Sequence, residues 1–274
     1  MTRLLFVGDI VGRPGRDLVT RGLKANISVQ KIDCDNVNVE NAAAGFGVTP
    51  EIANEILDAG AHVMTGGNHT FDKKEILPFF AQESRLLRPA NLPAGAPGAG
   101  HYVARATNGV NVGVINLMGR VFMNPIDDPF KVALTEIEKV KKDAAIVFVD
   151  FHAEATSEKV AMGWHLDGRA TVVVGTHTHV QTADERLLLQ GTAYITDVGM
   201  TGPHDGVIGV ERQAILTKFL TGMPQRFETA RENPRLNAVI VEADERTGRA
   251  TSIARLSLSL KAVDALIAQA AGGR

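Results

Sequence analysis

The sequence predicts an α/β fold: a four-layer αββα sandwich in which two central mixed β-sheets pack face to face and helices flank them. Short β-branched runs bounded by Gly or Asn alternate with helical segments, a pattern typical of α/β proteins. The later apolar runs are joined by shorter connections, so we expect a parallel set of strands first and a mixed set afterwards. Because no linker-like composition interrupts the pattern, we expect residues 1–274 to form a single domain.

Strands are expected where a short apolar run ends in polar or glycine residues. Five such runs are Leu4–Val7, Val37–Val39, His62–Met64, Ala145–Val149 and Val172–Val174. The segments Tyr102–Thr107 and Asn111–Asn116 flank Asn108-Gly109, which predicts a hairpin. Later strands are expected at Leu187–Leu189, Ala193–Thr196, Leu236–Ala243 and Thr251–Leu258.

Helices are expected between these strands, where apolar residues recur at helical spacing. Thr49 followed by Pro50 has the form of an N-cap and a first-turn proline. The segment Asn91–Gly100 is rich in Pro, Gly and Ala and is expected to be a loop. The predicted helices are Pro14–Val29, Pro50–Ala59, Glu75–Gln82, Phe130–Lys142 and Ser157–His165.

The composition is that of an ordinary globular protein, with 45% hydrophobic and 22% charged residues. A formal net charge of -2 gives no overall electrostatic reason to bind nucleic acid or an anionic membrane, so neither is an expected partner. The lone Cys34 excludes an internal disulfide framework and a multi-cysteine zinc site, which favours a reducing, cytoplasmic location. No export signal and no membrane-spanning apolar stretch are expected.

Each of the five early runs is followed by residues that can hold a metal ion. In a parallel sheet the carboxyl ends of the strands border the crevice where ligands bind, so we expect these side chains to converge there. Any one of them alone would more often cap a turn or be a satisfied, partly buried residue. The residues concerned are Asp9, Glu40, Asn41, Asn68, His152, His177 and His179.

These seven side chains offer oxygen and imidazole donors and no thiolate, which suits iron, manganese, zinc or cobalt better than calcium or magnesium. Seven protein ligands exceed what one transition metal usually takes, so we expect two ions that share a carboxylate. Such ions lie about 3.5–4 Å apart and are suited to in-line displacement at phosphorus. Two dications and two carboxylates leave net positive charge, which favours an anionic substrate.

The order of the motifs resembles that of the calcineurin-like metallophosphoesterases: an acid after each of two strands, then Gly-Asn-His, a single His and His-x-His. The matching residues here are Asp9, Glu40, Gly67-Asn68-His69, His152 and His177-Thr178-His179. The sequence departs from this order in two places: no His follows Asp9, and Glu40-Asn41 stands in place of an Asp. In both respects it resembles the bacterial YmdB-type branch. That branch similarly carries Val-Glu-Asn-Ala-Ala, and the resemblance covers nearly the whole chain.

The resemblance implies a role for each residue. One metal would be held by Asp9, Asn41 and His179, and the other by Asn68, His152 and His177. Glu40 would bridge the two ions, and His69 would protonate the leaving-group oxygen. Family precedent favours two divalent or trivalent ions of iron or manganese, with zinc, cobalt or magnesium as alternatives.

The implied activity is that of a metal-dependent phosphodiesterase acting on 2′,3′-cyclic nucleotides or related small-molecule phosphodiesters, with a metal-bridging hydroxide attacking phosphorus. The alternatives are a phosphomonoesterase of the same superfamily and a regulatory protein that binds nucleotide or metal with little turnover. Amidohydrolases also use His-x-His, but there the pair comes first in the chain and here it comes last. A homo-oligomer is compatible with the sequence.

Two further assignments stay open. His69 could orient a metal ligand instead of acting as the acid. Arg13 and Arg16 could contact a phosphate near Asp9, although such residues more often belong to a solvated helix start.

Overall fold

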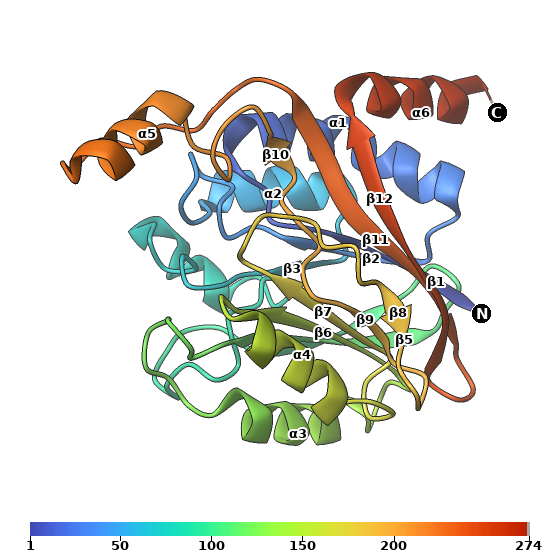
Figure 1. Cartoon of the computed structure of the whole chain (residues 1–274). Coiled ribbons are helices and arrows are strands. Elements are labelled where there is room, and N and C mark those ends of the chain that lie inside the picture. The colour runs from blue at the N-terminus through green and yellow to red at the C-terminus, as the bar shows by residue number, and fades with distance from the viewer. Residues whose placement is uncertain (273–274) are drawn as a thin grey trace.

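A computed structural model describes residues 1–272 as four layers (Figure 1). Helices α1, α2 and α6 cover the outer face of one sheet, and α3 and α4 cover the outer face of the other. The predicted αββα sandwich is confirmed, while α5 projects from one corner of it. The helices are α1 (Gly12–Gln30), α2 (Pro50–Asp58), α3 (Pro129–Val140), α4 (Thr156–His165), α5 (Arg212–Thr221) and α6 (Leu260–Gly272).

The first sheet is mixed because the C-terminal strands return to the N-terminal one. Its strands are β1 (Thr2–Val7), β2 (Cys34–Asn38), β3 (Val63–Thr65), β10 (Gly202–Pro203), β11 (Pro234–Asp244) and β12 (Arg249–Ser259). Strands β1, β2 and β3 are parallel, whereas β11 pairs antiparallel with both β1 and β12. In that register Leu4 lies opposite Val241.

The second sheet is mixed as well, with the strand order β4-β5-β6-β7-β9-β8. Its strands are β4 (His101–Arg105), β5 (Asn111–Met118), β6 (Ile146–His152), β7 (Val172–Thr176), β8 (Arg186–Leu187) and β9 (Ala193–Ile195). The four central strands are parallel, and β4 and β8 are antiparallel edges. The β4–β5 pair, with Arg105 opposite Asn111, confirms the predicted hairpin.

Three apolar layers fill the spaces between the four structural layers. Leu4 and Phe6 of β1 face the second sheet, where Phe6 stacks on Phe148 at 5.2 Å between ring centroids. Leu5 and Val7 alternate with them and pack under the helices. Successive side chains of a strand point to opposite faces, so a strand buried on both faces must be a continuous apolar run. This requirement explains the short uninterrupted runs of the sequence.

One predicted helix is wrong. The segment Glu75–Gln82 forms two short 3-10 helices, Lys74–Ile76 and Phe79–Ala81, instead of one α-helix. Pro78 lies between them, has no N–H to donate, and its ring would clash with the carbonyl four residues earlier in an α-helix. By contrast, Thr49 caps α2 as predicted, its side chain accepting a hydrogen bond from the backbone of Ile52.

The expected division of the strands into an early parallel set and a late mixed set is also wrong. Strands β6 and β7 lie in the second sheet, whereas the late strands β11 and β12 pair with β1 in the first. Pairing between strands more than 200 positions apart leaves no local pattern in the sequence. The sequence did not indicate α5, α6 or the two-residue β10.

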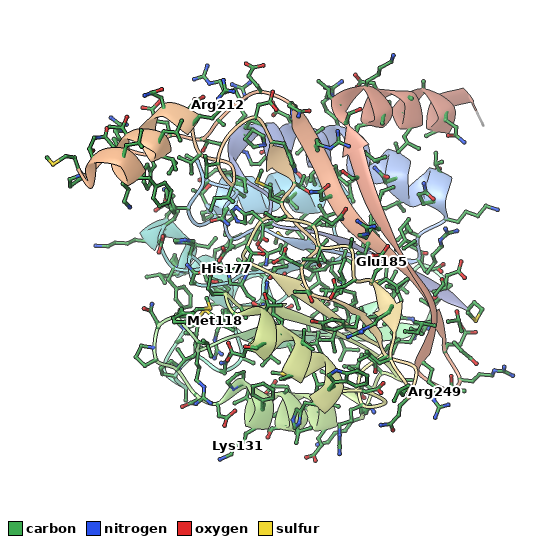
Figure 2. All side chains as sticks on the ribbon, in the orientation of Figure 1. Met118, Lys131, His177, Glu185, Arg212 and Arg249 are labelled. Carbon is green, nitrogen blue, oxygen red and sulfur yellow. The ribbon has the colours of Figure 1, made fainter. Side chains whose placement is uncertain are left out.

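The topology positions the site, because parallel strands bring their carboxyl ends to one edge. Strands β1, β2 and β3 of the first sheet and β6 and β7 of the second all end on the same side of the molecule. Figure 2 shows His177 at that end, with Arg249 at the opposite end of the sheets. Among residues 1–272, no helix combines the length and the apolar character needed to cross a membrane.

Candidate metal centre

The strand ends bring together two groups of donor atoms that could each hold a metal ion. One group consists of Glu40, His152 and His177, and the other of Asp9, Glu40 and His179. Within each group the donor atoms lie within 4.8 Å of one another, and Glu40 belongs to both. The described part of the chain therefore contains two neighbouring donor groups that share one carboxylate.

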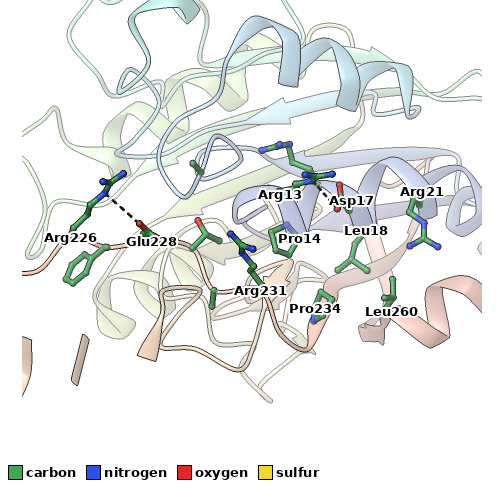
Figure 3. A pocket seen from close by; sticks show the side chains of 15 residues that line it. Arg13, Pro14, Asp17, Leu18, Arg21, Arg226, Glu228, Arg231, Pro234 and Leu260 are labelled. Atoms are coloured by element: carbon green, nitrogen blue, oxygen red, sulfur yellow. Dashed lines mark ion pairs between the residues drawn. The ribbon is translucent and has the colours of Figure 1, made fainter. Parts of the chain in front are cut away.

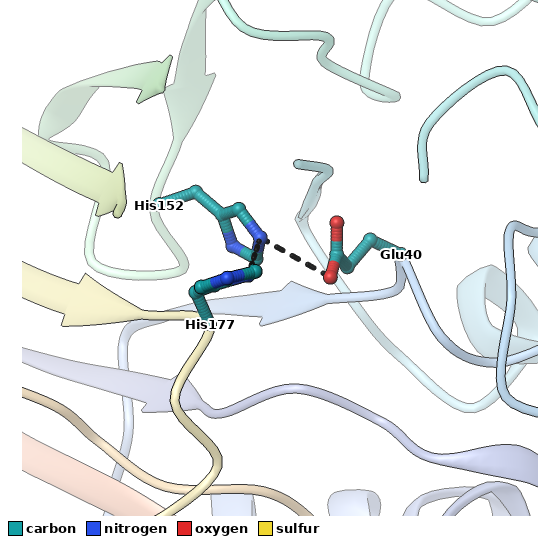
Figure 4. Close-up of side chains that lie close together, drawn as sticks. All are labelled: Glu40, His152 and His177. Carbon is teal, nitrogen blue, oxygen red and sulfur yellow. Dashed lines mark hydrogen bonds and ion pairs between the residues drawn. The ribbon is translucent and has the colours of Figure 1, made fainter. Parts of the chain in front are cut away.

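Glu40 lies at the junction of the two groups and is almost fully buried. Its Oε1 is 3.2 Å from Nε2 of His152, a contact drawn as a dashed line in Figure 4, and accepts a hydrogen bond from the side chain of Asn41. Its Oε2 accepts from the backbone N–H of His69. A Cβ at Gly67 would lie 2.1 Å from this Oε2, so the Gly-Asn-His turn can approach Glu40 only with glycine there.

In its neutral form, His152 turns a lone pair toward the centre. Its Nδ1 lies 2.9 Å from Oγ1 of Thr176, and that hydroxyl donates its own proton to Asp150. Thr176 therefore accepts from Nδ1–H, which leaves Nε2 unprotonated in the neutral ring. Nε2 faces Oε1 of Glu40, Oδ1 of Asn68 at 2.9 Å and Nδ1 of His177 at 3.0 Å.

The other two histidines have the same arrangement. Nε2 of His177 lies 2.9 Å from the carboxylate of Glu154, so its Nδ1 presents the lone pair to His152 (Figure 4). Nδ1 of His179 lies 2.9 Å from the carbonyl of Ile208, which can only accept, so Nε2 is the free nitrogen. Hydrogen bonds of this kind on the outer ring nitrogen orient imidazole ligands in metal proteins.

These residues fit a cation. Three lone-pair donors lie about 3 Å from Nε2 of His152, and when the rings are neutral this arrangement repels itself unless a positive charge joins it. Oδ1 of Asp9, in a fully buried side chain, has no hydrogen-bond partner. Buried polar atoms are normally satisfied, so an unpartnered carboxylate oxygen at this position fits a metal ligand.

The electrostatics agree with this interpretation. Burial raises the pKa of Asp9 to about 6, against the effect of His179 and His152. Burial also raises the pKa of Glu40, but His152 outweighs it and holds the value at about 2. Burial lowers the pKa of His152, while Glu40 and Asp9 raise it to a net value of about 9. The carboxylates thus draw positive charge to Nε2, and a cation would satisfy the same demand.

His177 remains neutral in this environment. Burial, followed by the neighbouring His152, lowers the pKa of His177 to about 3. A neutral imidazole is the form that binds a metal, so the ring is ready to act as a ligand at ordinary pH.

The two asparagines differ in orientation. Asn68 directs its carbonyl oxygen to His152, as a metal ligand would. Asn41 instead directs its amide nitrogen to Glu40 and to Nε2 of His179, the latter at 3.1 Å. Its oxygen would face the second group only after a half-turn of the amide. Asn41 therefore lies at the centre but does not present a donor atom in this orientation.

His69 lies beside the two donor groups and belongs to neither. Its Nδ1 is 2.7 Å from the carboxylate of Asp72, and its ring packs edge-on against Phe46 at 5.0 Å. The side chain is 28% exposed and lines a cavity of about 390 Å³ that opens onto the centre. A positioned, accessible imidazole next to the donor groups is suited to proton transfer.

The cavity is apolar on the side away from the centre. Its walls combine the polar residues of the donor groups with aromatic and aliphatic side chains from α5, from the segments before and after α5, and from the segments that follow β1 and β2. The apolar lining consists of Val11, Phe46, Val207, Ile208, Val210, Ile215, Phe219 and Phe227. A ligand with a charged end and a flat apolar body would match this distribution.

Buried polar networks support the strand ends from behind. Asp150 accepts hydrogen bonds from Asn38 and Thr65 of the first sheet and from Thr176 of its own, so it joins the two sheets directly beneath the centre. Burial raises the pKa of Asp150, against the effect of these bonds. The network places β2, β3, β6 and β7 relative to one another at the point where their loops carry the donors.

The His177-Thr178-His179 turn is strained and is held by an ion pair. Both histidines have positive φ, 100° and 67°, which is unfavourable for residues with a Cβ. Between them, Thr178 donates its N–H and its hydroxyl to Asp197. Asp197 pairs with Lys159 at 2.6 Å, and both side chains are almost fully buried. The turn thus keeps its shape through interactions with two other elements.

Sequence reasoning missed several of these supporting residues. Asp72 follows His69 by three positions and Glu154 follows His152 by two, so their spacing was a usable signal. No such signal in the sequence indicated Asp197 and Lys159, because each lies in a segment distant from the His177-Thr178-His179 turn.

The fold and the strand-end centre together define a class of protein. Two facing mixed sheets between helices, with metal-binding side chains at the strand ends, are the arrangement of the calcineurin-like phosphoesterases. More narrowly, a family model described as YmdB-like protein matches residues 5–256, and the chain belongs to that family.

Individual relatives agree with this assignment. The chain is 49% identical over 257 residues to the 2′,3′-cyclic-nucleotide 2′-phosphodiesterase of Bacillus subtilis, covering 94% of this chain and 97% of that protein. It resembles the crystal structure of a novel phosphatase from Mycoplasma pneumoniae with a TM-score of 0.88 and 34% identity, covering 94% and 93% of the two chains. A hypothetical protein from Thermus thermophilus has a TM-score of 0.87 and 38% identity, covering 94% and 99%.

Proposed function

We propose that this protein is a metal-dependent phosphodiesterase that hydrolyses 2′,3′-cyclic nucleotides. The observation that carries the proposal is the pair of donor groups that share the buried Glu40. The high identity to a Bacillus subtilis enzyme named for this activity supports the choice of substrate. Hydrolysis at the 2′ position would add water across the P–O2′ bond, leaving a 2′-hydroxyl and a 3′-phosphate.

We assign the donors to two ions. Asn68, His152 and His177 would hold one, Asp9 and His179 the other, with Glu40 between them and Asn41 joining the second after rotation of its amide. The mixed oxygen and nitrogen set favours iron or manganese over calcium. When bound, such ions supply positive charge to the phosphoryl oxygens and lower the pKa of water.

The protein's own residues would supply the proton, orient the metal ligands and bind the nucleobase. His69 would give a proton to the departing O2′ from Nε2, because Asp72 holds the ring through Nδ1. Glu154 and Ile208 would keep His177 and His179 in the tautomer that leaves a lone pair inward. The apolar wall of the cavity, including Phe46, would pack against the nucleobase.

The test uses purified protein stripped of metal and reloaded with single metals. Manganese- or iron-loaded protein is expected to hydrolyse 2′,3′-cyclic AMP to the 3′-nucleotide and to act more slowly on a phosphomonoester. Turnover of the monoester alone would identify a phosphomonoesterase. Nucleotide binding without turnover under every metal would identify a regulatory protein.

A further inference from the structure

A second cavity adjoins the cavity at the candidate centre. Figure 3 shows the arginines that line it. Its volume is about 710 Å³, and it lies between the start of α1 and the segment that follows α5. The two cavities share four lining residues, which are Ala44, Phe227, Glu228 and Thr229. The two cavities are therefore neighbours along these residues.

The second cavity has a charge opposite to that of the whole chain. Five arginines and two carboxylates line it, which leaves three positive charges, whereas the formal net charge of the chain is -2. The charged lining residues are Arg13, Arg16, Arg21, Arg226, Arg231, Asp17 and Glu228. Such a local concentration of one sign attracts an anion even though the molecule as a whole does not.

Three of the arginines are available to a ligand, and one of them is Arg226, which is 90% exposed and only 3.9 Å from Glu228. Arg16 is mostly buried and donates to the carbonyl of Ala42, and Arg21 pairs with Asp264 at 2.6 Å, so both are engaged. Arg13 is 83% exposed and only 3.7 Å from Asp17, a weak surface pair. Arg231 is exposed and makes no ion pair with any residue in the range 1–272. Arg13 and Arg231 lie beside Pro14 in Figure 3.

Guanidinium groups favour phosphate because their planar donors match its oxygens. A cyclic mononucleotide has one phosphate, which the centre would hold, so the arginines would have no partner. An oligonucleotide carries a further phosphate one nucleotide upstream. Phe227 borders both cavities, where a base between the two phosphates could stack on it.

We propose that the arginine-lined cavity binds the upstream phosphates of a short single-stranded oligoribonucleotide whose 2′,3′-cyclic phosphate end is hydrolysed at the centre. This inference rests on the proposed function and names its preferred substrate. The reaction is the same as for the cyclic mononucleotide. Water adds across the P–O2′ bond, and the oligoribonucleotide is left with a 2′-hydroxyl and a 3′-phosphate. The arginines add affinity for the longer substrate without touching the reacting bond.

The experiment compares 2′,3′-cyclic AMP with a triadenylate that ends in a 2′,3′-cyclic phosphate. For the metal-loaded wild type, kcat/KM is expected to be about tenfold higher for the triadenylate, the effect of one or two charge-assisted hydrogen bonds to phosphate. In the double variant Arg13→Gln/Arg231→Gln, the two substrates should have similar values of kcat/KM. Arg246→Gln is the matched control, because Arg246 is 87% exposed, lies 3.5 Å from Asp244 and is remote from the cavity. It should keep the ratio.

A binding measurement separates this inference from the proposed function. Affinity for 3′-phosphorylated triadenylate is measured at several salt concentrations, and the double variant should show a slope of log K against log salt smaller by about 1.4, at roughly 0.7 for each phosphate that is no longer neutralised. Equal ratios and equal slopes in wild type and double variant would overturn the inference. If neither substrate is hydrolysed, the proposed function fails, and the slopes alone decide whether the arginines bind phosphate.

Discussion

At the scale of single residues, the centre depends on which nitrogen of each histidine carries a proton. Thr176, Glu154 and Ile208 each accept from the outer nitrogen of one ring and leave the inner one free. The motifs in the sequence indicated the three ring residues but not these acceptors, because a backbone carbonyl such as that of Ile208 has no signature in sequence.

Replacing Glu154 tests this dependence. Glu154→Gln offers an amide that can direct its NH₂ group to the ring, so Nε2–H of His177 is no longer stabilised by a carboxylate. We expect metal affinity to fall about 10–100-fold, measured by competition with a chelator. Glu228→Gln, at another exposed glutamate of the same cavity, should leave the affinity unchanged. Equal affinities in all three proteins would show that Glu154 does not support the centre.

His69 allows a test of the acid. His69→Ala should retain bound metal but lose roughly 10²–10⁴-fold in turnover on 2′,3′-cyclic AMP, whose departing oxygen needs a proton. On an activated aryl phosphodiester, whose phenolate leaves unaided, the loss should be much smaller. Metal content is measured alongside. Equal losses on both substrates would mean that His69 positions the substrate, and loss of metal would make it a ligand.

At the scale of elements, the strained His-x-His turn depends on a buried ion pair from α4 and from the segment after β9. Lys159→Met would leave Asp197 buried without its cation, and breaking a buried pair in this way typically costs about 3–5 kcal/mol. We expect that loss in urea unfolding, together with weaker metal binding. Arg246→Met, at an exposed pair, should change stability by less than about 0.5 kcal/mol. A similar small change for Lys159→Met would contradict the role of the pair.

Helix α3 is joined to β4 by a second charged contact, which predicts a pH effect. Burial raises the pKa of Glu136, but His101 and Lys139 outweigh it, so the value in the folded protein is below the ordinary 4.5. A lowered pKa stabilises the fold above pH 4.5, and this contribution is lost as the pH falls through the folded value. The difference in the free energy of unfolding between wild type and Glu136→Gln should therefore become smaller as the pH is lowered. Glu138→Gln, at an exposed site on α3, is the matched control variant.

The elements also show the limits of sequence reasoning. Strands β1, β6 and β7 were predictable because a run buried on both faces is apolar at every position. The membership of β11 in the first sheet was not, because β11 pairs with β1 across more than 200 positions of the sequence. Likewise, the donors at the strand ends could be predicted from the sequence, whereas the Lys159–Asp197 ion pair that supports the His177-Thr178-His179 turn could not.

At the scale of the whole molecule, the return of β11 and β12 makes the first sheet depend on both ends of the chain. The shared apolar layer between the sheets includes residues from both halves. We therefore propose that the chain is one cooperative domain. Urea unfolding followed by fluorescence of the single Trp164, on α4, and by far-ultraviolet circular dichroism should give one coincident transition. Two separated transitions would indicate independent units.

The central claim is that two ions share Glu40 at the meeting point of the two sheets. Anomalous X-ray diffraction from a crystal of the manganese-loaded protein tests it most directly. We predict two peaks about 3.5–4 Å apart, one among Glu40, His152 and His177 and the other among Asp9, Glu40 and His179. A single peak, or peaks that lie away from Glu40, would contradict the account.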